Sequence, residues 1–319
     1  MNTLAPAAII GIDVSRDWLD LHCLADGQEL REPNTAEGHA RVVALARERG
    51  ALVGFEATGG QEWRLWAALD AEGIVTRQLP PAQVKAFARS QGTRAKTDRI
   101  DARLIARFLR FRPAVGRRRP PENLVLLRAL TTKRGQLVEL RKRLLTQIKT
   151  QGRTGIAGLF DDIDAGLKAL LDARIKDLEA RIRQAIAADE ALTETARILR
   201  SIPGIGLVTS TMLIAEMPEL GAITGGQAAA LVGLAPIADD SGARRGKRAI
   251  AGGRRSLRQV LYQAGLVAAY HNPDLKAWAE RLRDAGKPHK VVIVAVARKL
   301  VTIANALCKS RQKWVPRTA

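Results

Sequence analysis

The chain has 319 residues, enough for about two domains and a connector, and its 46% hydrophobic and 26% charged residues exclude a disordered chain. Lysine and arginine outnumber aspartate and glutamate by 52 to 32, which gives a net charge of +20 and a pI near 10.9. This excess predicts a polyanionic partner, most simply nucleic acid, with an anionic membrane surface or plain solubility as the alternatives.

The first 112 residues predict an α/β domain with a mixed sheet. Apolar or alternating segments that end at glycine, proline or an Asp-Gly turn indicate strands, and apolar residues at helical spacing indicate helices between them. The order β-β-β-α-β-α-β-α is typical of a sheet with helices packed on it. The predicted strands are 7–14, 19–26, 28–31, 51–58 and 74–80, and the predicted helices are 36–49, 61–72, 82–90 and 98–111.

A basic, proline-bounded segment at 113–121 predicts a linker, and two long helical patterns follow it. Leucine and isoleucine recur in both at steps of mostly three and four residues, and the segment 152–158 separates them. The spacing predicts an antiparallel helical hairpin or coiled-coil stalk, although a plain helical core has the same periodicity. The apolar positions are Leu124, Leu127, Leu137, Leu140, Leu144 and Ile148, then Leu167, Leu171, Ile175, Leu178, Ile182 and Ile186.

Glycine-rich turns alternate with helical runs from residue 201 onward, which predicts a second, mostly α domain. Its clearest helices are 255–270 and 289–308. The I-P-G-I-G motif at 202–206, followed by an apolar helix, resembles the hairpin of helix-hairpin-helix modules, in which glycines let backbone N–H groups approach a phosphate. A tight turn between two helices, without a ligand, is the alternative.

Nothing in the sequence predicts a zinc site, a disulfide framework or a membrane span. Cys23 and Cys308 are far apart and lack metal-binding spacing, which is consistent with a reducing cytoplasm. The N-terminal segment has no basic region typical of a signal peptide, and glycines and a proline interrupt the longest uncharged stretch, 220–238. Aromatic residues make up only 4% of the chain, which weakens models that depend on stacking of single-stranded bases.

Four carboxylates are candidates for a metal site. Asp13 ends the first predicted strand, and Glu56 lies in the fourth, just before a glycine turn. Asp98 and Asp101 are three residues apart and share one face of a helix. Gathered acids repel one another unless they hold a divalent cation, and oxygen ligands suit Mg²⁺, which would polarise a scissile phosphate. Each acid could instead be an ordinary cap or ion-pair partner, but the element order is that of ribonuclease-H-like nucleases.

Ser241 is the candidate nucleophile. It lies in a turn-like D-S-G context, and seven basic residues but no acid occur between 241 and 258. A hydroxyl among arginines could attack a phosphodiester while the cations stabilise the charge that develops, or it could simply cap a turn. No histidine is near in sequence to act as its base, so activation requires a metal, a carboxylate or another residue that folding brings close.

Basic residues surround both candidate sites. Residues 89–119 hold eleven basic residues and only two acids, which predicts a groove that guides phosphates past the carboxylates, whereas a plain solvated face is the alternative. The candidate nucleic-acid-binding residues are Lys96, Arg99, Arg103, Gly204, Gly206, Arg244, Arg245, Lys247, Arg248, Arg254, Arg255 and Arg258.

Taken together these motifs resemble one family, the DEDD transposases of the IS110 insertion-sequence group, which are similar in mechanism to serine recombinases. The matching pieces in the first half are G-I-D at 11–13, G-F-E-A-T-G-G at 54–60 and K-T-D-R-I-D-A at 96–102. Those in the second half are I-P-G-I-G at 202–206, L-V-G-L-A-P at 231–236, D-S-G at 240–242 and G-G-R-R-S-L-R at 252–258. The match covers nearly the whole chain in the same order.

The resemblance implies a RuvC-like domain over 1–112, a linker and coiled-coil hairpin over 113–198, and a mostly α transposase domain with a helix-hairpin-helix-like element over 199–319. It implies that Ser241 forms a transient phosphoserine bond to DNA, in a dimer or tetramer where Ser241 of one subunit meets the acids of another. The metal-binding tetrad that it implies, with Mg²⁺ as the cofactor, is Asp13, Glu56, Asp98 and Asp101.

The same resemblance implies double-stranded donor and target DNA as substrates, and a bacterial protein associated with the nucleoid in the cytoplasm. Some family members use a structured non-coding bridge RNA that pairs with both DNAs. Such an RNA partner would assign the choice of sequence to the RNA, which agrees with a protein rich in phosphate-binding residues and poor in aromatic ones.

Two other functions are compatible with these residues. A metal-dependent, structure-specific nuclease, such as a junction resolvase, would share the acids and basic grooves but would use water as its nucleophile. An architectural nucleic-acid binder would not need the acids at all. A proofreading-type DEDD exonuclease is disfavoured, because those enzymes carry a D-x-E pair on the first strand, whereas Val14 and Ser15 follow Asp13 here.

Overall fold

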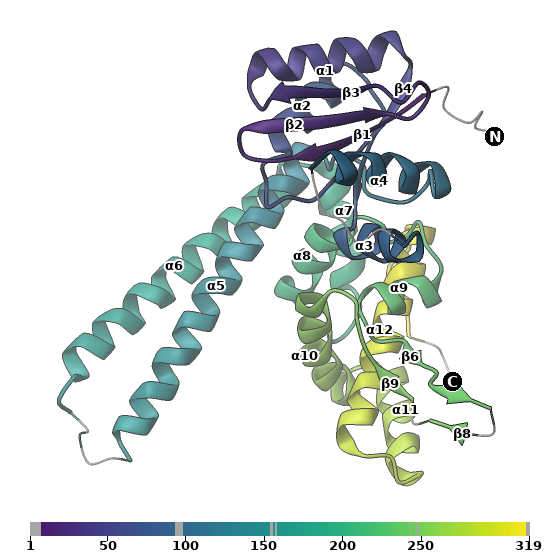
Figure 1. The fold of residues 1–319 in the computed structure, drawn as a ribbon. Helices are drawn as coiled ribbons and strands as arrows, with labels where there is room; N and C mark the ends of the chain where they lie inside the picture. The colour runs from purple at the N-terminus through teal and green to yellow at the C-terminus, as the bar shows by residue number, and fades with distance from the viewer. Residues whose placement is uncertain are drawn as a thin grey trace. The chain divides into compact units, whose positions relative to one another are not determined.

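The computed structural model describes residues 8–92, 98–153, 156, 158–242, 244–246 and 248–316, with the side chains of 98–100 and 244 outside that description. The chain divides into two compact units, which we call the first unit (residues 1–121) and the second unit (residues 122–319). Each unit is described by itself below (Figure 1).

The first unit is an α/β structure built around a mixed five-stranded sheet within the described residues (Figure 1). The strand order is β3-β2-β1-β4-β5, in which β1 is antiparallel to β2 but parallel to β4. The elements are β1 (Ala8–Val14), β2 (Trp18–Cys23), β3 (Glu29–Pro33), α1 (Ala36–Glu48), β4 (Ala51–Glu56), α2 (Trp63–Ala71), β5 (Thr76–Leu79), α3 (Pro81–Ser90) and α4 (Asp98–Phe111).

The two faces of this sheet carry separate hydrophobic clusters. Ile10, Ile12 and Phe55 project to one face and pack with residues of α1 and α2, including the buried Trp66. Ile9 and Leu52 project to the other face and pack against α3 and α4. Because successive side chains of a strand point to opposite faces, alternate residues of β1 and β4 separate the two helical layers.

The α4 helix lies unusually close to the sheet because two strand residues are glycines. A Cβ atom on Gly11 would lie 2.2 Å from the backbone oxygen of Ala102 and 2.5 Å from the backbone nitrogen of Ala106. A Cβ on Gly54 would lie 2.7 Å from the Cδ2 atom of Leu109. Because glycine has no side chain, α4 can approach β1 and β4 this closely.

All nine elements predicted for this part are present, with their ends shifted by a few residues. The predicted linker at 113–121 packs onto the first unit: Arg117 and Gln78 exchange two backbone hydrogen bonds at 2.9 Å. Gly116, at φ 94°, passes so close to Gln78 that a Cβ would lie 2.8 Å from its backbone oxygen. Arg119 also forms an ion pair with Asp70, so the compact part of the unit extends to residue 121.

The second unit is mainly helical and begins with two long helices that pack together as an antiparallel hairpin (Figure 1). Arg134 of α5 pairs with Glu179 of α6, and further along α5 Arg141 pairs with Asp172, earlier in α6. This opposite progression confirms the predicted antiparallel hairpin. The helices are α5 (Glu122–Gln151), α6 (Asp161–Ala187), α7 (Glu190–Arg200), α8 (Leu207–Glu216), α9 (Gly225–Leu231), α10 (Arg255–His271), α11 (Pro273–Asp284) and α12 (His289–Ser310).

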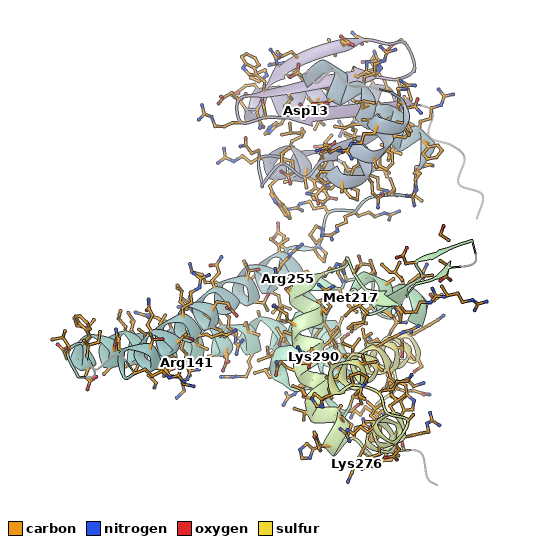
Figure 2. The ribbon with its side chains drawn as sticks, turned by 60° about the horizontal axis from the view of Figure 1, so that its bottom comes forward. Asp13, Arg141, Met217, Arg255, Lys276 and Lys290 are labelled. Atoms are coloured by element: carbon orange, nitrogen blue, oxygen red, sulfur yellow. The ribbon has the colours of Figure 1, made fainter. Side chains whose placement is uncertain are left out.

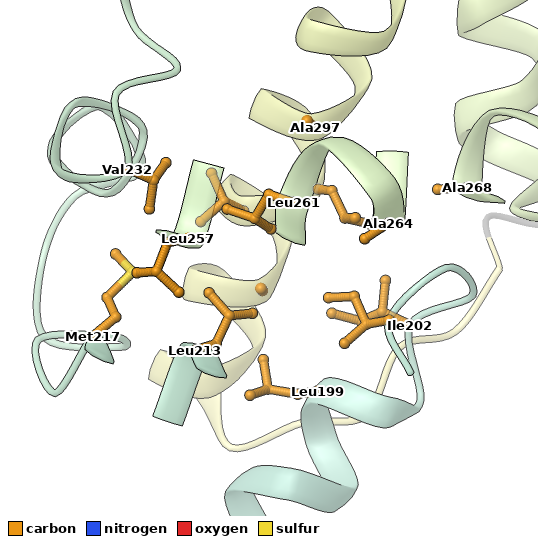
Figure 3. Packing of buried hydrophobic residues seen from close by; sticks show 14 of the residues in the cluster. Leu199, Ile202, Leu213, Met217, Val232, Leu257, Leu261, Ala264, Ala268 and Ala297 are labelled. Atoms are coloured by element: carbon orange, nitrogen blue, oxygen red, sulfur yellow. The ribbon is translucent and has the colours of Figure 1, made fainter. Parts of the chain in front are cut away.

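One hydrophobic core unites the C-terminal helices with the base of the hairpin. Leu199, Leu213 and Leu261 lie in its centre (Figure 3), and Leu127 of α5 belongs to the same cluster. By length and composition α12 could cross a membrane, but half of its apolar window is buried inside the protein. Val292 and Leu300 of α12 are completely buried in this core, as expected for the central helix of a folded unit.

A short β ribbon interrupts the helices and was not predicted from the sequence. Its four short strands pair in two antiparallel ladders, β6 with β9 and β7 with β8. Each strand has two residues, too few to produce the alternating pattern by which longer strands are recognised. The strands are β6 (Pro236–Ile237), β7 (Asp240–Ser241), β8 (Arg244–Arg245) and β9 (Ala249–Ile250).

The close approach of α4 gives a stability prediction. Gly11→Ala should destabilise the protein by about 1–3 kcal/mol, because the new methyl group meets helix backbone that cannot move alone. Gly54→Ala should cost less, because the Leu109 side chain that it meets can rotate. Urea unfolding followed by circular dichroism measures both, and equal midpoints for the two variants would contradict this account of the packing.

Candidate active site

Two of the predicted acids end neighbouring parallel strands. The pairing of β1 with β4 sets Gly11 opposite Gly54. Asp13 and Glu56 each follow one of these glycines by two residues, so they share the α4 face of the sheet and lie at equivalent positions at the carboxyl ends of their strands. Both are partly buried, and Figure 2 labels Asp13 in its unit.

The first turn of α4 reaches the same end of the sheet. Its second half, around Leu109, packs with Ile9 and Leu52 at the beginnings of the strands, so its beginning points toward their ends. Asp98 and Asp101 precede Ala102 and Ile105 by one helical turn, and those two residues face the sheet. The backbone therefore brings all four positions of the predicted tetrad to one end of the sheet.

The fit of a divalent cation depends on donor type and placement. Among the described residues, no group of three or more His, Cys, Asp or Glu side chains forms a metal-holding cluster. The side chain of Asp98, the fourth predicted ligand, lies outside the description. By donor type, carboxylate oxygens suit a hard, oxygen-preferring cation such as Mg²⁺, but the described side chains of Asp13, Glu56 and Asp101 do not by themselves form such a cluster.

Asp20 is an acid of this region that sequence reasoning missed. The antiparallel register sets it opposite Asp13, and its side chain is almost fully buried. Arg31 binds both of its carboxylate oxygens at 3.0 Å and so balances its charge. The signal that could have revealed it was the length of the turn between β1 and β2, because that turn fixes the register.

Glu62 is a second missed residue, and it holds the loop that follows Glu56. Its buried carboxylate accepts hydrogen bonds from the backbone nitrogen and hydroxyl of Thr58, the nitrogen of Gly60 and the side chain of Gln78, at 2.8 to 3.3 Å. The two glycines of the loop have φ of 74° and 108°, a backbone that other residues rarely adopt. An acid two residues after such a Gly-Gly pair was the available signal.

Ser241, the predicted nucleophile, lies in the second unit on the β ribbon. It pairs with Arg244 across the two-stranded ladder and is exposed, next to Gly242 at φ 55°. The neighbouring Asp240 receives two hydrogen bonds from Arg248, at 2.7 and 2.8 Å, which lower the pKa of its carboxyl. The ribbon thus presents the hydroxyl on a hairpin whose base is fastened by an ion pair.

The predicted nucleic-acid-binding residues have different roles in the structure. Arg254 binds Glu219 through the two terminal nitrogens, Nη1 and Nη2, of its guanidinium and is largely buried. Arg258 donates to backbone oxygens of the glycine turns, so both residues fasten the loops beside α10. Arg103, Arg245 and Arg255 are exposed (Arg255 is labelled in Figure 2). Lys96 and Lys247, and the side chains of Arg99 and Arg244, lie outside the described part of the chain.

The two glycines of the I-P-G-I-G motif also differ. Gly204 has φ 104°, and a Cβ there would lie 2.6 Å from the Cβ atom of Ala268 on α10, so helix packing alone explains it. Gly206 is exposed, has open space around it and precedes α8 without a side-chain cap. Only Gly206 is thus placed where a phosphate could approach the helix N-terminus.

The cysteines take no part in this chemistry. Cys23 and Cys308 are both buried and free, and burial raises the pKa of each thiol, that of Cys308 to about 11. Both therefore stay protonated near neutral pH and are neither nucleophiles nor ready metal ligands.

Comparisons with known proteins identify relatives of this chain. A model of DEDD transposases of the IS110 type, described as transposase, matches residues 10–151, and one described as transposase of the IS116/IS110/IS902 family matches 196–280. The pilin gene-inverting protein of Moraxella bovis is 28% identical over 96% of this chain and 97% of its own length. Its counterpart from Moraxella lacunata is 28% identical over 82% of this chain and 80% of its own length. An uncharacterized 44.8 kDa protein of insertion element IS116 from Streptomyces clavuligerus is 26% identical over 99% of this chain and 98% of its own length.

An α/β unit with carboxylates at its strand ends, joined to a basic helical unit and matched by two transposase models, defines an enzyme that acts on DNA. The chain belongs to the IS110 family of DEDD transposases. The membership predicted from the sequence motifs is confirmed.

The position of Asp13 gives a second prediction. Asp13→Asn should abolish DNA strand exchange but leave duplex binding nearly unchanged, because one strand-end carboxylate serves the reaction and contributes little to the basic surfaces. Gel assays of exchange and of binding test this with purified protein. Asp20→Asn is the matched control: it breaks the pair with Arg31 and should lower stability by about 1–3 kcal/mol while exchange persists. Normal recombination by Asp13→Asn would refute the role given to Asp13.

Proposed function

We propose that this transposase exchanges DNA strands through a phosphoserine intermediate on Ser241. The observation that carries the proposal is the exposed position of this serine on a ribbon of the second unit. It begins the segment 241–258, which contains seven basic residues and no acid. An exposed hydroxyl on a hairpin can reach a bulky duplex, and nearby cations stabilise the charge that develops on phosphorus. The relatives named for pilin gene inversion support DNA recombination as the overall reaction.

In this mechanism the Oγ atom of Ser241 attacks a scissile phosphate, the Oγ–P bond forms, and the P–O bond to the 3′ oxygen breaks. The serine proton passes to a base, and the departing 3′ oxygen takes up a proton as a hydroxyl. A 3′ hydroxyl from the other DNA then attacks the phosphoserine and regenerates Ser241. Energy of the phosphodiester is conserved in the covalent bond, so strands are rejoined without a further cofactor.

We propose that the first unit is RuvC-like, of the ribonuclease-H-like class, and holds Mg²⁺ between Asp13, Glu56, Asp98 and Asp101. The strand order β3-β2-β1-β4-β5, with only β2 antiparallel to both of its neighbours, supports this assignment. When bound, the cation would polarise the phosphate and favour ionisation of the attacking group. Arg31 pairs with Asp20, which sets this acid apart from the proposed ligand set.

We further propose that a structured RNA selects the DNA sites and that the protein acts near the nucleoid. A chain of +20 with many exposed basic side chains suits phosphate backbones in general, and base pairing by an RNA would supply the choice of sequence. The helix-hairpin-helix-like turn at Gly206 would add a contact with a phosphate that does not depend on sequence.

A nuclease that uses water as nucleophile is the second candidate. The observation that favours it is that, among the described residues, no hydrogen bond joins Ser241 to a group that could accept its proton, whereas the acids of the first unit need no serine. The two functions differ in one product, a covalent bond between protein and DNA.

The third prediction separates these functions. Purified protein, RNA from its own locus, DNA that carries the element's ends and Mg²⁺ should yield a DNA–protein adduct on a denaturing gel, and Ser241→Ala should remove it. Ser256→Ala is the matched control, because this serine lies in the same basic run but donates to Glu216. Nicked DNA without an adduct, unchanged in Ser241→Ala, would instead identify the nuclease.

We also propose that the α5–α6 hairpin joins subunits through its outer end as a coiled coil, in a dimer or tetramer. Large apolar side chains there are 45–67% exposed at helical spacing: Leu159, Ile163, Leu167 and Leu170. Ile175, in contrast, is half-buried on the hairpin.

The fourth prediction follows from this contrast. Leu167→Asp should lower the mass measured by light scattering with little change in thermal stability, because its side chain faces outward. Ile175→Asp should lower the melting temperature, because it places a charge in a partly buried position. An unchanged mass for Leu167→Asp would show that the outer end of the hairpin does not join subunits.

A further inference from the structure

A pocket of about 760 Å³ lies in the first unit beside the second half of α4. We call it the arginine–phenylalanine pocket, after the residues that carry the argument: Arg103, Arg107, Arg110, Phe87, Phe111 and His22. It is formed by α3, α4 and the end of β2, and it is separate from the strand ends at which Asp13 and Glu56 lie.

Three arginines of α4 line the pocket in a row. Arg103, Arg107 and Arg110 are exposed, and at about 1.5 Å per residue they span about 10 Å of the helix axis. Within the part of the chain that the structure describes, none of the three forms an ion pair with an acid, and Arg107 donates to the neutral side chain of Gln91 at 2.9 Å. The row is therefore a site of uncompensated positive charge that suits successive phosphates of one strand.

An aromatic stack forms another wall. Phe111 is 69% exposed, and its ring stacks on Phe87 with centroids 5.6 Å apart and planes at 23°. Phe87 in turn contacts the buried Phe108, with centroids 5.5 Å apart. The inner rings hold Phe111 in place and leave an apolar surface in water, which is unfavourable unless something flat covers it.

His22 contributes to the floor of the pocket. It is about 94% buried, and its Nδ1 atom has no hydrogen-bond partner within the described residues, the nearest acid oxygen being that of Glu29 at 3.7 Å. Burial lowers the pKa of His22, and the charge of Arg103 lowers it further, although Glu29 opposes both effects. Lowering this pKa favours the neutral imidazole, so the positive charge of the pocket comes from its arginines.

We propose that the arginine–phenylalanine pocket binds an unpaired single strand of nucleic acid, with one base stacked on Phe111 and the adjoining phosphates on the three arginines. Both parts are needed for the choice of partner: arginines alone would suit any duplex, but a base can cover Phe111 only when it is not paired and stacked in a helix. The low aromatic content of the whole chain had argued against base stacking, yet aromatic side chains gather at this point.

The pocket and the predicted tetrad share one helix. From Asp101 to Arg110 the axis of α4 advances about 13 Å, so a strand held in the pocket would continue toward the strand ends of the sheet. The inference rests on the proposed function only in that strand exchange supplies unpaired DNA, or its guide supplies unpaired RNA. It does not depend on Ser241.

The experiment measures binding of fluorescein-labelled 12-nucleotide DNA and RNA single strands, and of a 12-base-pair duplex, to the full-length protein by anisotropy. Phe111→Leu should weaken single-strand binding roughly tenfold while duplex binding changes less than twofold, because leucine keeps the apolar bulk but not the ring. Phe111→Tyr should restore it. The strand type that loses more affinity, DNA or RNA, identifies the strand that the pocket holds.

Arg107→Ala should reduce the steepness of log affinity against log salt concentration by about 0.7 for the single strands, because it removes one contact with a phosphate. Arg112→Ala is the matched control: it removes the same charge from the residue next to Phe111, outside the pocket.

Three results would overturn the inference: single-strand affinity unchanged in Phe111→Leu, equal losses for duplex and single strand, or a change of molecular mass in Phe111→Leu, which would make the ring a protein contact. The Ser241 adduct assay is independent of all three. An intact adduct with unchanged single-strand binding would reject the pocket alone, whereas a missing adduct with the expected single-strand losses would reject only the phosphoserine.

Discussion

The close approach of α4 to Gly11 and Gly54 is the contact on which the site depends. Without side chains on these residues, the helix packs against the backbone of β1 and the surface of β4, and its first turn reaches the strand ends. Each glycine precedes an acid by two residues. Because side chains alternate between the two faces of a strand, Asp13 and Glu56 project from the same face as the glycines, toward α4. Packing and the placement of the acids are thus one arrangement.

This contact also gives α4 two proposed functions along its length. Its first turn carries the acids Asp98 and Asp101, and its exposed side carries arginines from Arg103 to Arg110. A phosphate group needs a cation at its oxygens both where it is bound and where it reacts. In the proposed function, the acids at one end of α4 and the guanidinium groups along its side would serve both requirements on one strand.

Net charge alone overstates the surface available to nucleic acid. Arg31, Arg248 and Arg254 each bind both oxygens of an acid within their own unit, and Arg258 binds loop carbonyls. These arginines shape the strand pair, the ribbon of Ser241 and the turn before α10. The positive charge that faces solvent without such partners is concentrated in fewer places, of which the row on α4 is one.

The sequence by itself determined the nine elements of the first unit, the helical hairpin and the family, because apolar periodicity, glycine turns and ordered motifs are local properties of the chain. It also identified Asp13, Glu56 and Ser241 as candidates from residue type and position. Only the tertiary structure decided that Asp20 lies opposite Asp13, that Glu62 holds the loop after Glu56, and that Gly204 serves packing against α10.

The same division applies to the second unit and to the pocket. Two-residue strands carry no period, so the ribbon that presents Ser241 was visible only in three dimensions. Arg254 and Arg103 look alike in the sequence, yet one is fastened to Glu219 and the other lines a pocket with Phe111. The physical reason is that strand register, ion pairs and pockets join residues far apart in the chain, and a local pattern does not encode the partner.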